Sequence, residues 1–263
     1  MNLQLDNRLA LVSGSTAGIG FAIAETLAAE GARVIVNGRT QAGVDAAVAA
    51  IRKATGKPAL GFAGDLSTAI AAETVVNAYP GIEILVNNLG IFEATPFEKI
   101  PDEHWRRFFD VNVLSGARLA RLVLPAMRKA NWGRIVFISS ESGVHIPAEM
   151  VHYGMTKAAQ IAVARGIAET VAGTGITVNS VLPGPTKSRG VGDFVDALAK
   201  EQGKSAAEFE QEFFRSVRPT SLIKRFSSTQ EVASLVAYVA SPLASSTTGA
   251  ALRVDGGTIK SAF

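Results

Sequence analysis

Tyr153 and Lys157 stand four residues apart in the segment YGMTK, and Ser140 precedes them. On a helix, this spacing places two side chains on one face about one turn apart, so an ammonium can lie beside a phenol. A phenol with the ordinary pKa of about 10 gives up protons poorly at neutral pH, and a neighbouring cation favours the phenolate. The pair therefore suits proton exchange with a substrate oxygen. Such a pair is common by itself, so the rest of the chain decides its meaning.

A glycine-rich turn, SGSTAGIG at residues 13–20, lies between a predicted first strand and a predicted first helix. Gly14 permits a tight turn, Gly18 lets the backbone approach a phosphate, and Gly20 allows close helix packing. The amide N–H groups at the helix start then face a pyrophosphate. This placement predicts a dinucleotide site.

Composition restricts the classes of protein to which the chain can belong. Of its 263 residues, 48% are hydrophobic and 19% are charged, so the chain can bury a sizeable core. No apolar run reaches the ~18 residues of a membrane span, and the start lacks a signal-peptide pattern, so we expect a cytoplasmic protein with no membrane partner. The net charge of +3 comes without a basic run interleaved with aromatics, so no nucleic-acid partner is expected.

Metal and thiol chemistry have no support in the sequence. There are no cysteines, which excludes disulfides, thiolate catalysis and cysteine-ligated metals. The three histidines, His104, His145 and His152, do not follow a metal-ligand spacing. We therefore expect no metal.

Short β-branched runs alternate with longer alanine-rich stretches along the whole chain. This pattern predicts an α/β fold in which one domain, residues 1–263, holds a doubly wound, Rossmann-like, seven-stranded parallel sheet with helices on both faces. The predicted strands are Arg8–Ser13, Arg33–Asn37, Ala59–Ala63, Ile84–Asn87, Arg134–Ser139, Ile176–Leu182 and Ala250–Val254. The predicted helices are Ile19–Glu30, Gln41–Ala54, Thr68–Ala78, Asp102–Lys129, Val151–Ala172 and Thr229–Ala240.

Residues 187–218 break this alternation. They are charged, contain Phe194, Phe209, Phe213 and Phe214, and lie between two predicted strands at the carboxyl edge of the sheet, where ligands bind. We interpret the segment as a helical flap over a substrate pocket, with a purely structural helical pair as the alternative.

Taken in order, these motifs resemble those of the short-chain dehydrogenase/reductase family, in its ordinary branch of about 250 residues. The resemblance runs nearly end to end. Leu89 departs from the family's usual alanine, for which we expect a local repacking. The matching motifs are residues 13–20, Asp65, residues 87–90, Asn112, Ser140 with Tyr153 and Lys157, Pro183-Gly184 and residues 254–257.

The resemblance implies an oxidoreductase that interconverts a carbonyl and a secondary alcohol by hydride transfer, with Tyr153 exchanging the proton. It implies that Lys157 lowers the Tyr153 pKa and holds the nicotinamide ribose, and that Ser140 orients the substrate oxygen. Asn112 is expected to hold a water that links Lys157 to solvent. Ser140 is preferred over Ser139 because neighbours on a strand point to opposite faces and the family's spacing from serine to tyrosine falls on Ser140, which leaves Ser139 a packing role.

The cofactor preference depends on the end of the second strand. Gly38 stands where relatives that use NAD often have an acid, and Arg39 follows, which favours the 2′-phosphate of NADP(H) over NAD(H). Ala17 stands where many relatives that use NADP have a basic residue, so a solvated Arg39 is the alternative. The full set of expected cofactor contacts is Gly14, Ser15, Thr16, Ala17, Gly18, Ile19, Gly20, Gly38, Arg39, Asp65, Leu66, Asn88, Gly90, Tyr153, Lys157, Pro183, Gly184 and Thr186.

A non-catalytic dinucleotide-binding sensor or scaffold is the competing class, but the presence of Asn112, Ser140, Tyr153 and Lys157 in order favours the enzyme. The chain is also similar to 3-oxoacyl-carrier-protein reductases, yet acyl thioesters, cyclic ketones, steroids and sugars are all compatible substrates. Family members are commonly homotetramers, so the same assembly is expected. Between Ser140 and Tyr153, Glu141, His145 and Met150 are either pocket residues or simple loop residues.

Overall fold

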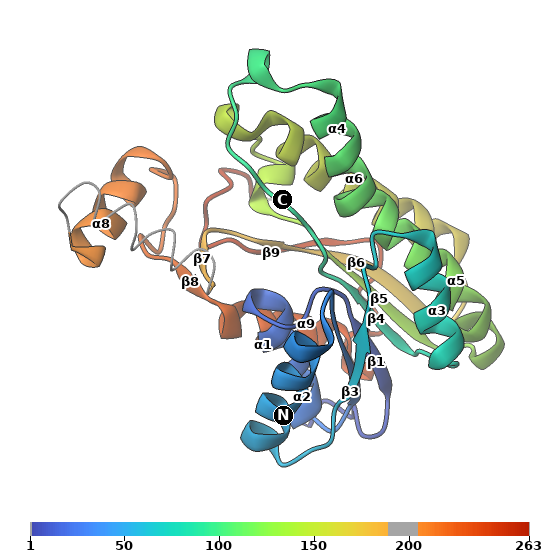
Figure 1. Cartoon of the computed structure of the whole chain (residues 1–263). Coiled ribbons are helices and arrows are strands. Elements are labelled where there is room, and N and C mark those ends of the chain that lie inside the picture. Colours follow the sequence, from blue (N-terminus) through green and yellow to red (C-terminus); the bar gives the residue numbers. More distant parts are fainter. Residues whose placement is uncertain (1, 189–204, 263) are drawn as a thin grey trace.

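The computed structural model describes residues 2–188 and 205–262. Seven parallel strands form its central sheet, in the order β3-β2-β1-β4-β5-β6-β9 (Figure 1). This arrangement confirms the predicted fold class. The strands are β1 (Leu9–Val12), β2 (Arg33–Gly38), β3 (Leu60–Ala63), β4 (Ile84–Asn87), β5 (Gly133–Ile138), β6 (Ile176–Pro183) and β9 (Ala251–Val254).

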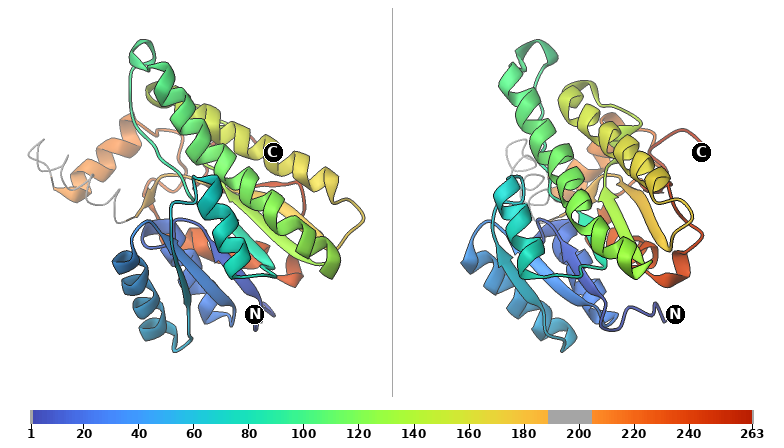
Figure 2. Two further views of the ribbon diagram at one scale, coloured as in Figure 1. Left: turned by 45° about the vertical axis from the view of Figure 1, so that its right-hand side comes forward. Right: turned by 90° about the vertical axis from the view of Figure 1, so that its right-hand side faces the viewer.

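Helices cover both faces of this sheet (Figure 2). One face carries α1 (Gly18–Ala29), α2 (Gln41–Thr55) and α9 (Thr229–Val239), and the other carries α3 (Ala69–Ala78), α5 (Ser115–Ala130) and α6 (Val151–Thr170). The helix α4 (Asp102–Phe109) packs on α6. Short 3₁₀ turns occupy Phe97–Lys99, Glu141–Gly143, Ala148–Met150 and Pro242–Ala244. No helix among the described residues is both long and apolar enough to cross a bilayer.

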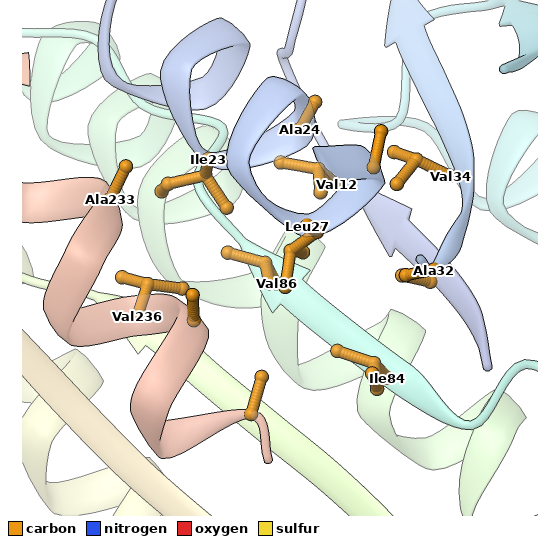
Figure 3. Close-up of a cluster of buried hydrophobic side chains, with 14 of the residues drawn as sticks. Val12, Ile23, Ala24, Leu27, Ala32, Val34, Ile84, Val86, Ala233 and Val236 are labelled. Atoms are coloured by element: carbon orange, nitrogen blue, oxygen red, sulfur yellow. The ribbon is translucent and has the colours of Figure 1, made fainter. Parts of the chain in front are cut away.

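A continuous apolar cluster fixes α1 and α9 to the sheet (Figure 3). Leu27 of α1, Val86 of β4 and Val236 of α9 are all fully buried. Full burial of such a side chain contributes roughly 1.5–3 kcal/mol. The glycine turn that precedes α1 is therefore attached to a rigid support.

The strand order creates a crevice beside β1. Val12 pairs with Val36 of β2 on one side and with Val86 of β4 on the other. The chain turns in opposite directions after β1 and β4, and ligands of open α/β sheets bind at such a switch point, beyond the carboxyl ends of the strands.

The predicted helix Asp102–Lys129 is interrupted, which corrects its description as one regular helix. A π-helical turn at Asp110–Leu114 separates α4 from α5, and the Ser115 N–H donates to the carbonyl of Asp110, five residues earlier. The buried Asn112 lies in this turn, and its bonds to a neighbouring loop are tertiary contacts that helical periodicity does not encode. Wide turns of this kind are frequent at functional sites.

Two further short strands, absent from the sequence prediction, form a separate parallel pair. Residues Thr186–Lys187 (β7) pair with Ser227–Ser228 (β8). Between them lies α8 (Ala206–Ser216), which begins with a capping box formed by Ser205 and Glu208. Much of the predicted flap, including Phe194, lies outside the described residues, but α8 belongs to its described part.

Candidate active site

Three predicted catalytic residues meet in one cavity of about 860 Å³. Ser140 follows β5, and Tyr153 and Lys157 come from successive turns of α6. The Ser140 hydroxyl lies close enough to Tyr153 to lower the pKa of its phenol. The Lys157 Nζ lies 5.5 Å from the centroid of the Tyr153 ring. The neighbouring Ser139 donates instead to the Lys157 carbonyl at 2.7 Å, so it fixes the α6 backbone, in keeping with the packing role expected for it.

The pKa of Tyr153 differs from the sequence expectation. Burial raises it to about 12, and the neighbouring Ser140 hydroxyl opposes this increase. Glu141 raises the pKa further and Arg218 lowers it, whereas Lys157 is not among the groups that shift it. The expected lowering by Lys157 is therefore wrong for this structure, because loss of hydration outweighs the neighbouring charges.

Lys157 is itself buried, with 5% of its surface exposed. Its Nζ donates to the carbonyl of Ile138 at 2.9 Å and to Oε1 of Gln160 at 3.0 Å. Burial lowers the pKa of Lys157 to about 7, because an ammonium loses hydration inside the protein. Its charge therefore depends on pH in the neutral range.

Asn112 is fully buried and holds three elements together. Its Oδ1 accepts from the N–H of Ile91 at 2.8 Å, and its Nδ2 donates to the Ile91 carbonyl and to Thr156 Oγ1, both at 2.9 Å. The main-chain carbonyl of Asn112 accepts from Gln160 Nε2 at 2.7 Å. The Gln160 side chain therefore links Asn112 to Lys157 by hydrogen bonds. The sequence motifs did not point to Gln160.

The glycine turn at the start of α1 has the conformation that its sequence predicts. Gly14 and Gly18 have φ angles of 61° and 60°, which favour glycine. A Cβ on Gly20 would lie 2.4 Å from Asn88 Nδ2, which donates to the carbonyls of Ser13 and Gly14 at 3.0 Å. No side chain caps the start of α1, so its first N–H groups are not occupied by a capping residue.

The predicted cofactor contacts divide between two adjoining hollows, and Ala17 borders both. The large cavity lies at the reaction end, and a second cavity of about 150 Å³ lies at the ends of β2 and β3. The large cavity is lined by Ala17, Ile19, Gly20, Asn88, Gly90, Tyr153, Lys157, Pro183, Gly184 and Thr186, and the small one by Gly14, Thr16, Ala17, Gly38, Arg39, Asp65 and Leu66. With the glycine turn between two openings, these residues fit an elongated dinucleotide.

Two predicted contacts lie apart from these linings. Gly18 faces Ser188, because a Cβ added to Gly18 would lie 3.4 Å from the Cβ of Ser188. Ser15 is fully buried: its hydroxyl donates to the Val12 carbonyl, and its N–H donates to the Asn37 carbonyl. Ser15 therefore supports the turn from within, and its contact with the cofactor stays a prediction.

Another part of the lining of the large cavity is aromatic and contains an ion pair. Phe92 meets the Tyr153 ring edge-on at 6.4 Å, and α8 contributes Phe209 and Phe213. Arg218, just after α8, donates through Nε to Glu141 at 3.0 Å and lies 3.3 Å from Glu149.

These contacts settle part of what the sequence left open for the segment before Tyr153. Glu141 and Met150 line the cavity, whereas His145 is not among the described residues that line it. No group of three or more His, Cys, Asp or Glu residues in the described chain is placed to hold a metal ion.

Residues 14–258 match a family model described as Enoyl-(Acyl carrier protein) reductase. The chain is 43% identical over 264 residues to the Uncharacterized oxidoreductase YvaG of Bacillus subtilis, with 100% of both chains covered. It is 34% identical over 259 residues to the 3-oxoacyl-[acyl-carrier-protein] reductase FabG of Vibrio cholerae, covering 97% of this chain and 98% of that protein. L-Sorbose reductase from Gluconobacter frateurii, solved with NADPH and L-sorbose, superposes with a TM-score of 0.93 at 29% identity and 99% and 100% coverage.

The fold and these relatives define an oxidoreductase. The chain belongs to the short-chain dehydrogenase/reductase family, whose members use NAD or NADP, and the resemblance stated from its motifs is confirmed.

Proposed function

We propose that this protein is an NADP(H)-preferring oxidoreductase that interconverts a carbonyl and a secondary alcohol, with Tyr153 as the acid and base. The observation that carries the proposal is that Ser140, Tyr153 and Lys157 line one cavity together with residues of the glycine turn. A bound nicotinamide dinucleotide supplies or accepts the hydride. The protein's own residues then have to place a carbonyl and exchange one proton.

Each side chain has a role that its surroundings support. Ser140 and Tyr153 present hydroxyls to one substrate oxygen, which both can hydrogen-bond. With a pKa raised to about 12, Tyr153 carries its proton at neutral pH and can donate it as negative charge develops on that oxygen during reduction. Lys157 lines the same cavity and can hydrogen-bond a ribose.

The preference for NADP(H) is supported by Arg39, which lines the small cavity beside Gly38 with no acid at either position. A charge-assisted hydrogen bond contributes ~1.5–3 kcal/mol, or about ten- to a hundredfold in cofactor preference. Comparing kcat/KM for NADPH and NADH tests this. Arg39→Ala should lose that preference, whereas Arg33→Ala, at the exposed start of β2, should keep it. A wild-type advantage for NADH would refute the assignment.

The substrate is a small carbonyl compound with an apolar part, as supported by Phe92, Phe209 and Phe213 around the cavity. A panel containing a cyclic ketone, a ketose, a steroid ketone and a 3-oxoacyl thioester, followed by loss of NADPH absorbance, tests this proposal. Turnover of at least one compound is expected. Tight NADPH binding with no turnover of any carbonyl or alcohol would favour the non-catalytic sensor. The cytoplasmic location and the homotetramer stay predictions.

A further inference from the structure

Gln160 occupies the centre of a buried polar network that the reaction scheme has not yet used. Only 1% of its surface is exposed. It lies on α6, three residues after Lys157 and seven after Tyr153, which places all three side chains on one side of the helix. A buried amide is costly unless it is hydrogen-bonded, and here both ends of the amide have partners.

The orientation of this amide follows from its two partners. An ammonium only donates hydrogen bonds and a main-chain carbonyl only accepts them, so Oε1 must face Lys157 and Nε2 must face the Asn112 carbonyl. The reversed amide would place donor against donor and acceptor against acceptor. The network therefore has one satisfied arrangement.

This arrangement also determines where the Lys157 ammonium points. A lysine has three N–H donors, and the Ile138 carbonyl and Gln160 Oε1 occupy two of them. A Cβ built on Gly90 would lie 3.6 Å from Nζ, and Gly90 and Lys157 both line the large cavity. The remaining donor is thus available on the side of the cavity, where a ribose hydroxyl would be held.

We infer that Gln160 is a positioning residue for Lys157: its amide clamps the ammonium against the cavity and ties it to the Asn112 turn. Gln160 thus joins Lys157 to the Asn112 carbonyl directly. A carboxamide does not ionise near neutral pH, so this link is a fixed support and not a carrier of protons. The water that the resemblance places at Asn112, linking Lys157 to solvent, stays a prediction. The catalytic part of the inference rests on the proposed function, whereas the clamp itself does not.

Two substitutions distinguish a hydrogen-bonding role of Gln160 from a role in packing alone. Gln160→Leu keeps the approximate size of the side chain but makes it apolar and removes the acceptor. The charged form of Lys157 then loses a hydrogen bond, so the pKa of Lys157 falls below that of the wild type. Gln160→Glu places a carboxylate beside the ammonium, so the pKa of Lys157 rises. Tyr153 is the ionisable ring that faces this ammonium, and it is unchanged in both variants. The matched control is Gln230→Leu on the exposed face of α9.

The primary measurement needs no substrate. NMR titration of the lysine side-chain signals, with Lys157 assigned by its absence in Lys157→Arg, gives the pKa in the wild type and the variants. Opposite shifts in Gln160→Leu and Gln160→Glu are expected, with none in Gln230→Leu. Unchanged titration in both folded Gln160 variants would overturn the clamp. If Gln160→Leu does not fold, the Gln160→Glu shift alone decides the question.

The second measurement connects the clamp to turnover. In Gln160→Leu we expect kcat/KM to fall about tenfold or more, the loss of one hydrogen bond to a charged group, and its alkaline limb to move to lower pH. Gln160→Glu should move that limb to higher pH. A wild type that turns over no carbonyl would defeat the proposed function and leave the titration result standing. A titration shift without any change in kcat/KM would instead overturn the positioning role.

Discussion

The two walls of the large cavity are built in different ways. On one wall, Lys157 lines the cavity, and behind it a buried chain of hydrogen bonds of 2.7–3.0 Å joins Lys157 to the Ile138 carbonyl and, through Gln160, to the Asn112 carbonyl. On the other wall, Phe209 and Phe213 of α8 line the cavity, and the partly exposed Arg218 pairs with Glu141, 77 positions earlier in the chain. The first wall, here called the fixed wall, includes Tyr153 and leaves little freedom to the groups proposed to react, whereas the second is called the adjustable wall. The second rests on contacts between side chains, which can change without disturbing the sheet.

The largest effect should come from Tyr153→Phe, which removes the proposed acid from the fixed wall. Positioned acid–base groups contribute about 10²- to 10⁴-fold, so kcat should fall by that factor. NADPH affinity should change little, since the ring and its contact with Phe92 remain. Steady-state kinetics and a binding titration measure both. Turnover near that of the wild type in the folded variant would show that the acid is misassigned.

A smaller but still large effect is expected from Gly20→Ala. The new Cβ would lie 2.5 Å from the Gly14 carbonyl as well as against Asn88, so the turn must open. We expect NADPH affinity to fall at least tenfold, about 1.4 kcal/mol, as measured by fluorescence titration. Gly166→Ala on α6 meets nothing within 4 Å and is the matched control. Equal affinity in both variants would contradict the proposed place of the dinucleotide.

Arg218→Met tests the adjustable wall by itself. The variant leaves the Glu141 carboxylate, which is 4% exposed, without its 3.0 Å partner. Burying an unpaired charge is costly, so the segment after α8 should move away from the cavity. The KM for the carbonyl substrate should rise about tenfold while NADPH affinity stays constant. Arg215→Met, which removes a more exposed ion pair on α8, should do neither. Parallel losses of substrate and NADPH binding would mean that the two walls are not independent.

The smallest effect is on stability, through Lys157→Met. The folded pKa of about 7 lies below the ordinary lysine value of 10.5, so the unfolded chain binds the proton more readily between these values. The buried ammonium therefore destabilises the wild type most below pH 7, and this cost disappears as pH rises towards 10.5. The stability of Lys157→Met relative to the wild type should accordingly decrease from pH 6 to pH 10, as measured by urea unfolding. A difference independent of pH would show that Lys157 titrates normally.

The fixed wall was the more predictable of the two. The alternation of strands and helices predicted the sheet, and the spacing of Tyr153 from Lys157 predicted that they share a face, because both patterns are local. Gln160 was missed although its spacing from Lys157 offered the same signal. The π turn at Asn112 gave no such signal, since it depends on a loop at Ile91.

The adjustable wall was foreseen only in outline. The sequence showed an aromatic segment near the carboxyl edge of the sheet. The pairing of Arg218 with Glu141 joins residues 77 positions apart, so no periodic pattern in the sequence indicates it. The Tyr153 pKa was wrongly expected to fall for a related reason. Spacing indicates which charge is near, whereas desolvation depends on everything packed around the phenol.

The two residue pairs between β7 and β8 bring together the two ends of the segment that contains α8. The strands of the central sheet lie outside the segment that β7 and β8 enclose. The sequence between β7 and β8 can therefore lengthen, shorten or diverge while the sheet keeps its alignment. Under the proposed function, grafting this segment from a relative should therefore change substrate selectivity without changing the sheet.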